Sequence, residues 1–267
     1  MVTVDEIEAA RRRLPPEVVQ TPLLPCPALH EGRPAFLKAE SLQVTGSYKA
    51  RAAFTVLASL DPAARQRGAV LASSGNFAAA FAFMGRRLGI PTAVVMMRRT
   101  APYKVERTHR LGAEVIFCDD RWDAREELLA HLEAERGLTV IHHYEDPRVI
   151  AGHGTIGLEI LEDCPEAGLV LVPVSPTGLD IDRLRPTWEA LADLEPTHPL
   201  GLAVGVLLTK TRSGTRSRRE ARDVLTELDY PVMDTEIPLA EWPYAVSFGT
   251  APSEFGAYED LLAELKS

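Results

Sequence analysis

The chain has 267 residues, of which 46% are hydrophobic and 25% charged, as in an ordinary globular protein with one large domain or two small ones. Its formal net charge of −9 argues against nucleic acid as a general partner. No apolar run is long enough to span a membrane, and the acidic N-terminal stretch ahead of Arg11-Arg12-Arg13 is not a signal peptide. We therefore expect a cytoplasmic protein without a membrane partner.

The number and spacing of the cysteines also agree with a cytoplasmic location. Cys26, Cys118 and Cys164 are odd in number and scattered along the chain. Such thiols are typical of a reduced cytosolic protein rather than of a disulfide framework or a metal site. We expect no bound structural metal.

The first elements follow from local signals. Thr3 and Glu6 form a capping-box pattern, which predicts a helix over 4–14 that Pro15-Pro16 ends. An extended segment at 21–25 and a strand at 35–39 come next. From Arg51 onward, apolar strands alternate with helices. We expect strands at 68–72, 92–97, 114–117 and 138–141, and helices at 76–88, 103–111 and 123–135.

The alternation continues to the end of the chain. Pro147 is well placed to begin a helix that stops near Cys164-Pro165. Strands are expected at 169–174, 202–208 and 232–237, and helices at 179–194, 215–228 and 253–265. This order predicts an α/β fold with βαβ units: a three-layer parallel sheet flanked by helices, with a smaller βαβ subdomain inserted at about 52–145. We expect two parts, 1–167 and 168–267, that share a sheet.

A lysine follows a strand and a polar loop in the stretch 37–49. Gly46 turns the loop, and the pattern predicts a helix that begins at Ser47 and carries Lys49 in its first turn. The positive end of a helix favours the neutral form of an amine, which is a nucleophile and can form a Schiff base with an aldehyde cofactor. A solvated helix lysine is the alternative interpretation.

A second small-residue turn stands between a strand and a helix. It consists of Ser73-Ser74-Gly75-Asn76 and is followed by Phe77. Successive backbone N–H groups at such a turn, together with a helix N-terminus, can bind an anion. A tight turn with an asparagine cap is the alternative.

Residues 40–49 and the Ser-Ser-Gly-Asn turn together resemble the threonine/serine dehydratases, pyridoxal-phosphate enzymes of the tryptophan-synthase-β type. The resemblance runs from about residue 4 to Val174 and includes the segment at 151–160. It implies that Lys49 is the catalytic lysine that binds pyridoxal phosphate and that Asn76 contacts the ring oxygen of this cofactor. It also implies that Ser73, Ser74, Gly75 and Asn76 bind a small amino-acid substrate. Such a protein would eliminate water from serine or threonine, with Lys49 handling the α-proton.

Two positions near this site depart from the family pattern. Phe77 stands where the family usually has histidine, which weakens the prediction of a native substrate pocket. His153 stands where the family often has glutamine. We interpret His153 as a packed loop histidine, with a ligand or acid–base role as the alternative.

The segment that binds the cofactor phosphate in this family differs more strongly in this chain. After Val174 the family has a run of glycines whose N–H groups hold the phosphate, whereas this chain has Ser175-Pro176-Thr177-Gly178-Leu179. Pro176 has no N–H and a fixed φ, so it cannot replace glycine there. Only Gly178 matches the end of the motif, and we assign it to cofactor binding.

The later segments resemble another family, the ParA-type partition ATPases, in its C-terminal half. These segments are 171–184, 204–211 and 231–238. The chain contains no Gly-x-x-x-x-Gly-Lys-Ser/Thr motif, so we do not expect ATP hydrolysis. The two resemblances meet at the strand ending at Val174, which indicates a chimera, engineered or natural.

Three functional hypotheses follow. The first is a dehydratase-like protein that binds pyridoxal phosphate through Lys49, with weak or no ammonia-lyase activity. The second is a catalytically inert fold chimera. The third is a ParA-like nucleotide- or DNA-associated protein, for which one basic cluster is the evidence. A solvated helix face is the favoured interpretation of this cluster. The cluster consists of Lys210, Arg212, Arg216, Arg218, Arg219 and Arg222. Nucleic acid is therefore not an expected partner, and a homodimer is compatible with the sequence.

Overall fold

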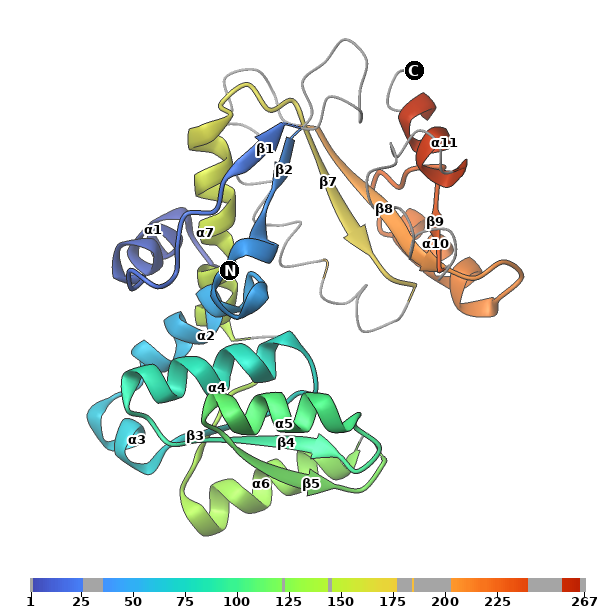
Figure 1. Cartoon of the computed structure of the whole chain (residues 1–267). Helices are drawn as coiled ribbons and strands as arrows, with labels where there is room; N and C mark the ends of the chain where they lie inside the picture. The colour runs from blue at the N-terminus through green and yellow to red at the C-terminus, as the bar shows by residue number, and fades with distance from the viewer. Residues whose placement is uncertain are drawn as a thin grey trace. The chain divides into compact units, whose positions relative to one another are not determined.

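The computed structural model of the chain describes residues 2–25, 36–121, 123–143, 146–176, 184, 203–239 and 256–264 (Figure 1). Its contacts divide the chain into two compact units. One consists of Val2–Pro22 and Ala39–Ile160 and is called the Lys49 unit below. The other consists of Met1, Leu23–Lys38 and Leu161–Ser267 and is called the second unit. The domain boundaries expected from the sequence remain a prediction.

The Lys49 unit begins with α1 (Val4–Arg13), and its predicted capping box is confirmed. Thr3 N donates to Glu6 Oε2 at 2.8 Å, and Glu6 N donates to Thr3 Oγ1 at 3.3 Å. The unit continues with η2 (Glu40–Leu42), η3 (Val44–Gly46), α2 (Lys49–Ala58), α3 (Pro62–Arg67), β3 (Ala69–Ala72), α4 (Asn76–Leu88), β4 (Thr92–Met97), α5 (Pro102–Leu111), β5 (Glu114–Cys118), α6 (Asp123–Arg136), β6 (Thr139–Val140) and most of α7 (Pro147–Asp163).

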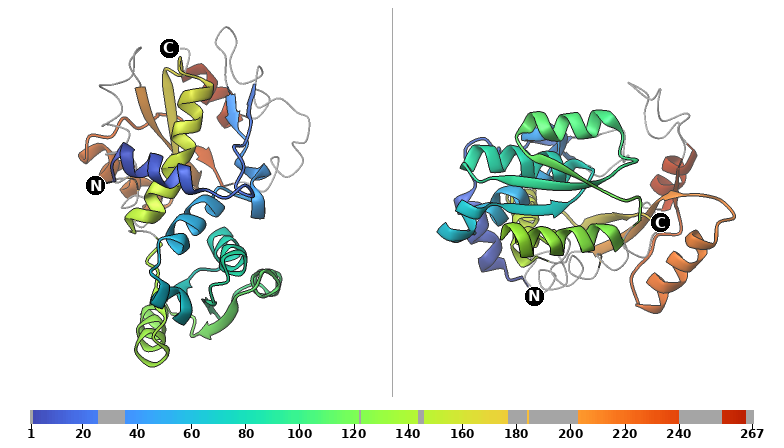
Figure 2. Two further views of the ribbon diagram at one scale, coloured as in Figure 1. Left: turned by 90° about the vertical axis from the view of Figure 1, so that its left-hand side faces the viewer. Right: turned by 90° about the horizontal axis from the view of Figure 1, so that it is seen from below.

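A parallel sheet forms the centre of this unit, with strand order β5-β4-β3-β6. Every residue of β3 and β4 is buried, and alternate residues face opposite layers. Leu71, Val94 and Met96 pack with the apolar residues of α2 and α4. Val70 and Val95 pack with those of α6. Figures 1 and 2 show α4 and α5 on one face of the sheet and α6 on the other, which confirms the α/β prediction.

The second unit contains two smaller sheets. β1 (Leu23–Pro25) pairs antiparallel with β2 (Phe36–Lys38). β7 (Leu169–Val174), β8 (Ala203–Thr211) and β9 (Ile237–Pro238) are parallel in the order β7-β8-β9. Two helices, α10 (Arg216–Glu227) and α11 (Gly256–Glu264), follow β8 and β9 in the chain.

The strand predicted at 232–237 is wrong. Val232 forms only an isolated bridge with Val206, and β9 begins at Ile237. Between them, the N–H groups of Asp234 and Thr235 donate to the Glu264 carboxylate at 2.6 and 2.8 Å. Because these donors are bonded to a side chain, they cannot extend a strand ladder.

The predicted start of the lysine helix at Ser47 is also wrong. Thr45 and Gly46 have φ values of +67° and +72°, and Ser47 is extended with φ −165° and ψ 158°. Two left-handed residues followed by an extended one interrupt the helical path, so α2 begins at Lys49. The helix expected at 179–194 lies outside the described residues, apart from Leu184.

Candidate active site

Lys49 is the first residue of α2 in the structure. Its side chain is partly buried, and its Nζ lies 4.0 Å from the centroid of the neighbouring Tyr48 ring. No side chain caps the start of α2. The amine therefore lies at the positive end of a helix, against the π face of an aromatic ring.

The turn before Lys49 contains buried polar atoms that have no hydrogen-bond partner among the described residues. Arg107 Nη2 donates to the backbone oxygen of Thr45 at 2.7 Å, which holds the turn in place. Among the described residues, Thr45 Oγ1 and Ser47 Oγ are buried without a hydrogen-bond partner. Buried hydroxyls are normally paired, so these two atoms are available to a ligand.

The Ser73–Asn76 turn lies between β3 and α4. Ser73 is buried, and its N–H donates to Val95 O at 3.2 Å, whereas Gly75 and Asn76 are exposed. In the described part of the chain, no side chain caps α4, and a Cβ added to Gly75 would meet nothing within 4 Å. Gly75 N donates to Ser73 Oγ at 3.4 Å within the turn. The first N–H groups of α4, which have no partner within the helix, follow beside the open space at Gly75.

The lysine loop and this turn belong to elements that pack together. Both η3 and α2 contact α4. The His153 ring lies 4.9 Å from the Tyr48 ring and 6.3 Å from the Phe77 ring, measured between centroids. Phe77 also lies 4.8 Å from His143. Three rings, those of Tyr48, His153 and Phe77, thus connect the residue before Lys49 with the residue after Asn76, and the His143 ring lies against Phe77.

His153 lies on α7, so its interpretation as a loop residue is wrong. Its Nε2 is buried and has no hydrogen-bond partner among the described residues. Burial, together with the positive charge of Lys49, holds the pKa of His153 well below its usual value. The imidazole is therefore uncharged at neutral pH.

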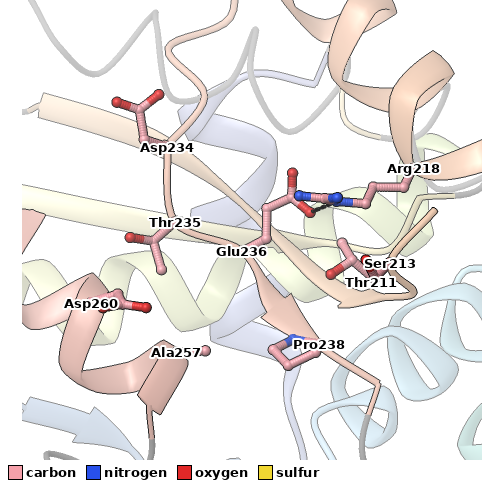
Figure 3. Close-up of a pocket in the computed structure, with 9 residues that line it drawn as sticks. All are labelled: Thr211, Ser213, Arg218, Asp234, Thr235, Glu236, Pro238, Ala257 and Asp260. Carbon is pink, nitrogen blue, oxygen red and sulfur yellow. Dashed lines mark hydrogen bonds and ion pairs between the residues drawn. The ribbon is translucent and has the colours of Figure 1, made fainter. Parts of the chain in front are cut away.

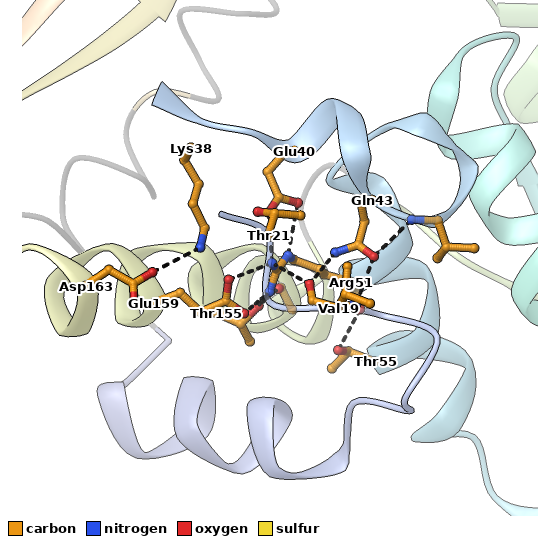
Figure 4. Close-up of polar contacts among 12 residues, drawn as sticks. Val19, Thr21, Lys38, Glu40, Gln43, Arg51, Thr55, Thr155, Glu159 and Asp163 are labelled. Atoms are coloured by element: carbon orange, nitrogen blue, oxygen red, sulfur yellow. Dashed lines mark hydrogen bonds and ion pairs between the residues drawn. The ribbon is translucent and has the colours of Figure 1, made fainter. Parts of the chain in front are cut away.

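A buried arginine fixes the first turn of α2 (Figure 4). The Arg51 side chain is fully buried, and it donates to both oxygens of Glu40 at 2.8 and 3.0 Å. It donates to Glu159 at 2.6 and 2.8 Å, to Thr155 Oγ1 at 3.2 Å and to Val19 O at 3.2 Å. This network joins α2 to α7, to Val19 in the segment after α1, and to Glu40 at the start of the lysine loop. Sequence reasoning missed it, because its only local signal is an arginine in an apolar helix.

The second unit contains a separate hollow of about 500 Å³ (Figure 3). Arg218 lies on its wall and donates to Glu236 at 2.6 Å, and Arg222 donates to the same carboxylate at 2.9 Å. Arg216 pairs with Glu220. Three arginines of the basic cluster are therefore paired with two neighbouring carboxylates, which lowers the net positive charge of this helix face.

The structure brings Lys49, Ser73, Ser74, Gly75 and Asn76 into one unit. Gly178 lies outside the described residues. Lys49 at the start of α2 and the Ser73–Asn76 turn at the start of α4 therefore lie on helices that pack against each other.

The comparisons with known proteins identify the family. The family described as pyridoxal-phosphate dependent enzyme matches residues 14–179, more than half of the chain, and the chain belongs to this family. The L-threonine ammonia-lyase of Thermotoga maritima is 41% identical over 181 residues, which are 67% of this chain and 45% of that protein. The serine racemase of Arabidopsis thaliana is 38% identical over 175 residues, 65% of this chain and 53% of that protein.

Solved structures agree with the fold. Maize serine racemase has a TM-score of 0.68 at 30% identity, covering 78% of this chain and 62% of that one. The processed form of threonine deaminase isoform 2 from Solanum lycopersicum has a TM-score of 0.64 at 25% identity, covering 78% of this chain and 60% of that one. The chain spans about half the length of the curated relatives it matches.

The described residues fit pyridoxal phosphate, the cofactor of this family. Lys49, at the start of α2, carries an amine of the kind that an aldehyde can bind. The open space beside Gly75 and the uncapped start of α4 suit an anionic group. Thr45 Oγ1, Ser47 Oγ and His153 Nε2 are buried polar atoms that lack partners among the described residues and can bond a polar ligand. The predicted cofactor is therefore confirmed, whereas the individual site residues remain predictions.

No helix in the described part of the chain is long and apolar enough to cross a membrane. Within the same residues, no group of three or more His, Cys, Asp or Glu side chains could hold a metal ion.

Proposed function

We propose that this chain is a pyridoxal-phosphate-dependent ammonia-lyase acting on L-serine or L-threonine, with Lys49 as its catalytic lysine. The observation that carries the proposal is the position of Lys49 at the start of α2, in elements packed against α4 and its uncapped Ser73–Asn76 turn. The threonine ammonia-lyase and serine racemase relatives support a small amino acid as substrate.

Each residue has a distinct task in this proposal. The backbone N–H groups at the start of α4, beginning with Asn76, bind the substrate carboxylate together with the hydroxyls of Ser73 and Ser74, while the Gly75 N–H is bonded to Ser73 Oγ. The Asn76 amide orients the cofactor ring. Lys49 Nζ, once neutral, takes the proton from the substrate α-carbon, and the proton that it then returns goes to the β-hydroxyl group, which leaves as water. When bound, pyridoxal phosphate supplies an electron sink for the charge left on that carbon.

The surrounding residues keep the lysine in position. The Tyr48 ring lies 4.0 Å from Nζ, and the Phe77 ring, next to Asn76, is buried. Arg51 holds the first turn of α2 against α7 through Glu159. Fixing the lysine in this way reduces the entropy lost when substrate and amine meet.

Ammonia release tests this function. Protein incubated with pyridoxal phosphate should release ammonia and the corresponding 2-oxo acid from L-threonine or L-serine, and Lys49→Ala should abolish the release. Lys104→Ala, on α5, is the matched control and should retain it. Folded protein that carries the cofactor and releases no ammonia from either amino acid would overturn the lyase proposal.

A second candidate is an inert chimera whose residues from about 170 onward derive from a ParA-type partition ATPase. Pro176, just beyond the end of β7, favours it because proline cannot supply the N–H that a phosphate-binding loop needs. This candidate predicts that pyridoxal phosphate does not bind at all, so the cofactor measurement separates it from the lyase. A DNA-associated protein is disfavoured by the paired arginines of α10.

A further inference from the structure

His153 Nε2 is a buried polar atom with no hydrogen-bond partner among the described residues. A buried group in this state destabilises the fold relative to a paired one, so native proteins keep few of them. Those that are kept often belong to a binding site, where a ligand supplies the missing bond. The position of His153 shows which ligand this is.

His153 contacts both halves of the proposed site. Its ring lies against Tyr48, which directly precedes Lys49, at 4.9 Å between centroids and with planes 58° apart. It meets Phe77, which directly follows Asn76, edge to face at 6.3 Å and 83°. The imidazole therefore lies between the Tyr48 and Phe77 rings, whose residues adjoin Lys49 and Asn76 in the chain, and it is close enough to Lys49 for the charge of the amine to act on it.

The charges around the ring keep it neutral. Burial has the largest effect on the pKa of His153, and Lys49, His143 and Arg51 lower it further. Two carboxylates of the same unit, Glu40 and Glu159, both bond to Arg51. A neutral imidazole carries one N–H donor and one acceptor nitrogen, so it pairs well with a hydroxyl, which can both donate and accept.

We propose that His153 is a specificity-determining residue of the amino-acid site, and that its Nε2 forms the hydrogen bond to the side-chain hydroxyl of bound L-serine or L-threonine. The proposal rests on the proposed function. An amino acid with an aliphatic side chain leaves Nε2 unpaired inside the site. Sites that bond a substrate hydroxyl reject the analogue that lacks it for this reason.

Binding of L-serine and L-alanine tests the proposal, because the two differ by the hydroxyl alone. Dissociation constants are measured from the change in cofactor absorbance as each amino acid is added. Wild-type protein should prefer L-serine, and His153→Leu should reduce the ratio of the two constants by about tenfold or more. His153→Gln keeps a hydrogen-bonding group and should retain most of the preference. His131→Leu, on the exposed face of α6, should leave the ratio unchanged.

The ratio is insensitive to a general loss of folded protein, which affects both ligands equally. An unchanged ratio in folded His153→Leu would overturn the proposal. The ¹⁵N shift of the His153 imidazole in cofactor-free protein gives a second readout. L-Serine should move this shift and L-alanine should not, whereas equal responses would also overturn the proposal. A protein that shows no cofactor absorbance at all instead contradicts the proposed function, so the two failures are distinguishable.

Discussion

Arg51 donates to both carboxylate oxygens of Glu159, from Nη1 to Oε1 at 2.6 Å and from Nη2 to Oε2 at 2.8 Å. The two residues are 108 positions apart and lie on α2 and α7. Both side chains are almost fully buried, with exposed fractions of 0% and 4%. This pair fixes the helix that begins with Lys49.

Removing the carboxylate of this pair should destabilise the protein strongly. Glu159→Ala leaves the Arg51 guanidinium buried with part of its charge uncompensated, and the expected loss of unfolding free energy is about 3 kcal/mol or more. Urea denaturation measures it. Glu8→Ala breaks the exposed Arg12–Glu8 pair and should cost less than about 1 kcal/mol. Equal losses in the two variants would contradict the structural role given to Glu159.

Replacing each of two glycines of α7 by alanine should have different effects on stability. A Cβ on Gly152 would lie 2.6 Å from the Ala52 Cα, so Gly152→Ala should force α7 away from α2 and cost about 1–3 kcal/mol. Gly157 has open space at the same position, and Gly157→Ala should be neutral or stabilise by up to about 1 kcal/mol. Thermal unfolding of both variants gives the comparison. Similar melting temperatures would mean that the helices do not approach so closely.

Gly75→Ala should weaken ligand binding while changing the stability of the fold only a little. Gly75 has φ −117° and ψ −153°, and a Cβ there meets no protein atom within 4 Å, so stability should change little. In the proposed site the added methyl group occupies space meant for the ligand. The affinity for pyridoxal phosphate or for L-serine should fall about tenfold or more. A stable variant with unchanged affinity for both would show that the turn is not part of the site.

The pH dependence of stability should report the neutral state of His153. Its folded-state pKa is held down first by burial and then by Lys49, whereas an unfolded histidine titrates near about 6.5. Below that pH the unfolded chain binds the proton and the folded chain does not. The free energy of unfolding therefore falls on acidification, with a contribution of up to about 1.4 kcal/mol per pH unit.

His153→Gln removes this contribution and should make the stability curve flatter between pH 7 and the folded-state pKa. Urea denaturation at several pH values checks it, with His131→Gln, on the exposed face of α6, as the control. Parallel curves for wild-type protein and His153→Gln would mean that His153 titrates normally in the folded state.

Local patterns were sufficient to predict much of the Lys49 unit. The boundaries of α4 and β4 were predicted to the residue, because each apolar segment lies between clear glycine, proline or asparagine signals. The small residues of Ser73–Asn76 predict a turn between a strand and a helix, and the structure has β3 and α4 on either side of it. These features depend on neighbours in the chain, so sequence alone reveals them.

Features that depend on distant residues could not be predicted. Arg51 meets Glu159 only after folding, and no spacing rule connects positions 108 residues apart. His153 was interpreted as a loop residue between two glycines, yet Gly152 is small because α7 packs against Ala52. β9 was placed too early because the Glu264 carboxylate, from α11, captures two backbone donors. Each error reflects a tertiary contact that overrides a local signal.

The central claim is that Lys49 binds pyridoxal phosphate, and a cofactor titration tests it most directly. Wild-type protein should develop a visible absorbance band that saturates with added pyridoxal phosphate, and borohydride reduction should leave the cofactor attached to the peptide containing Lys49. Lys49→Ala should lose the band, whereas Lys104→Ala should keep it. A folded wild-type protein that shows no band at saturating cofactor, or a band that persists in Lys49→Ala, would contradict the account.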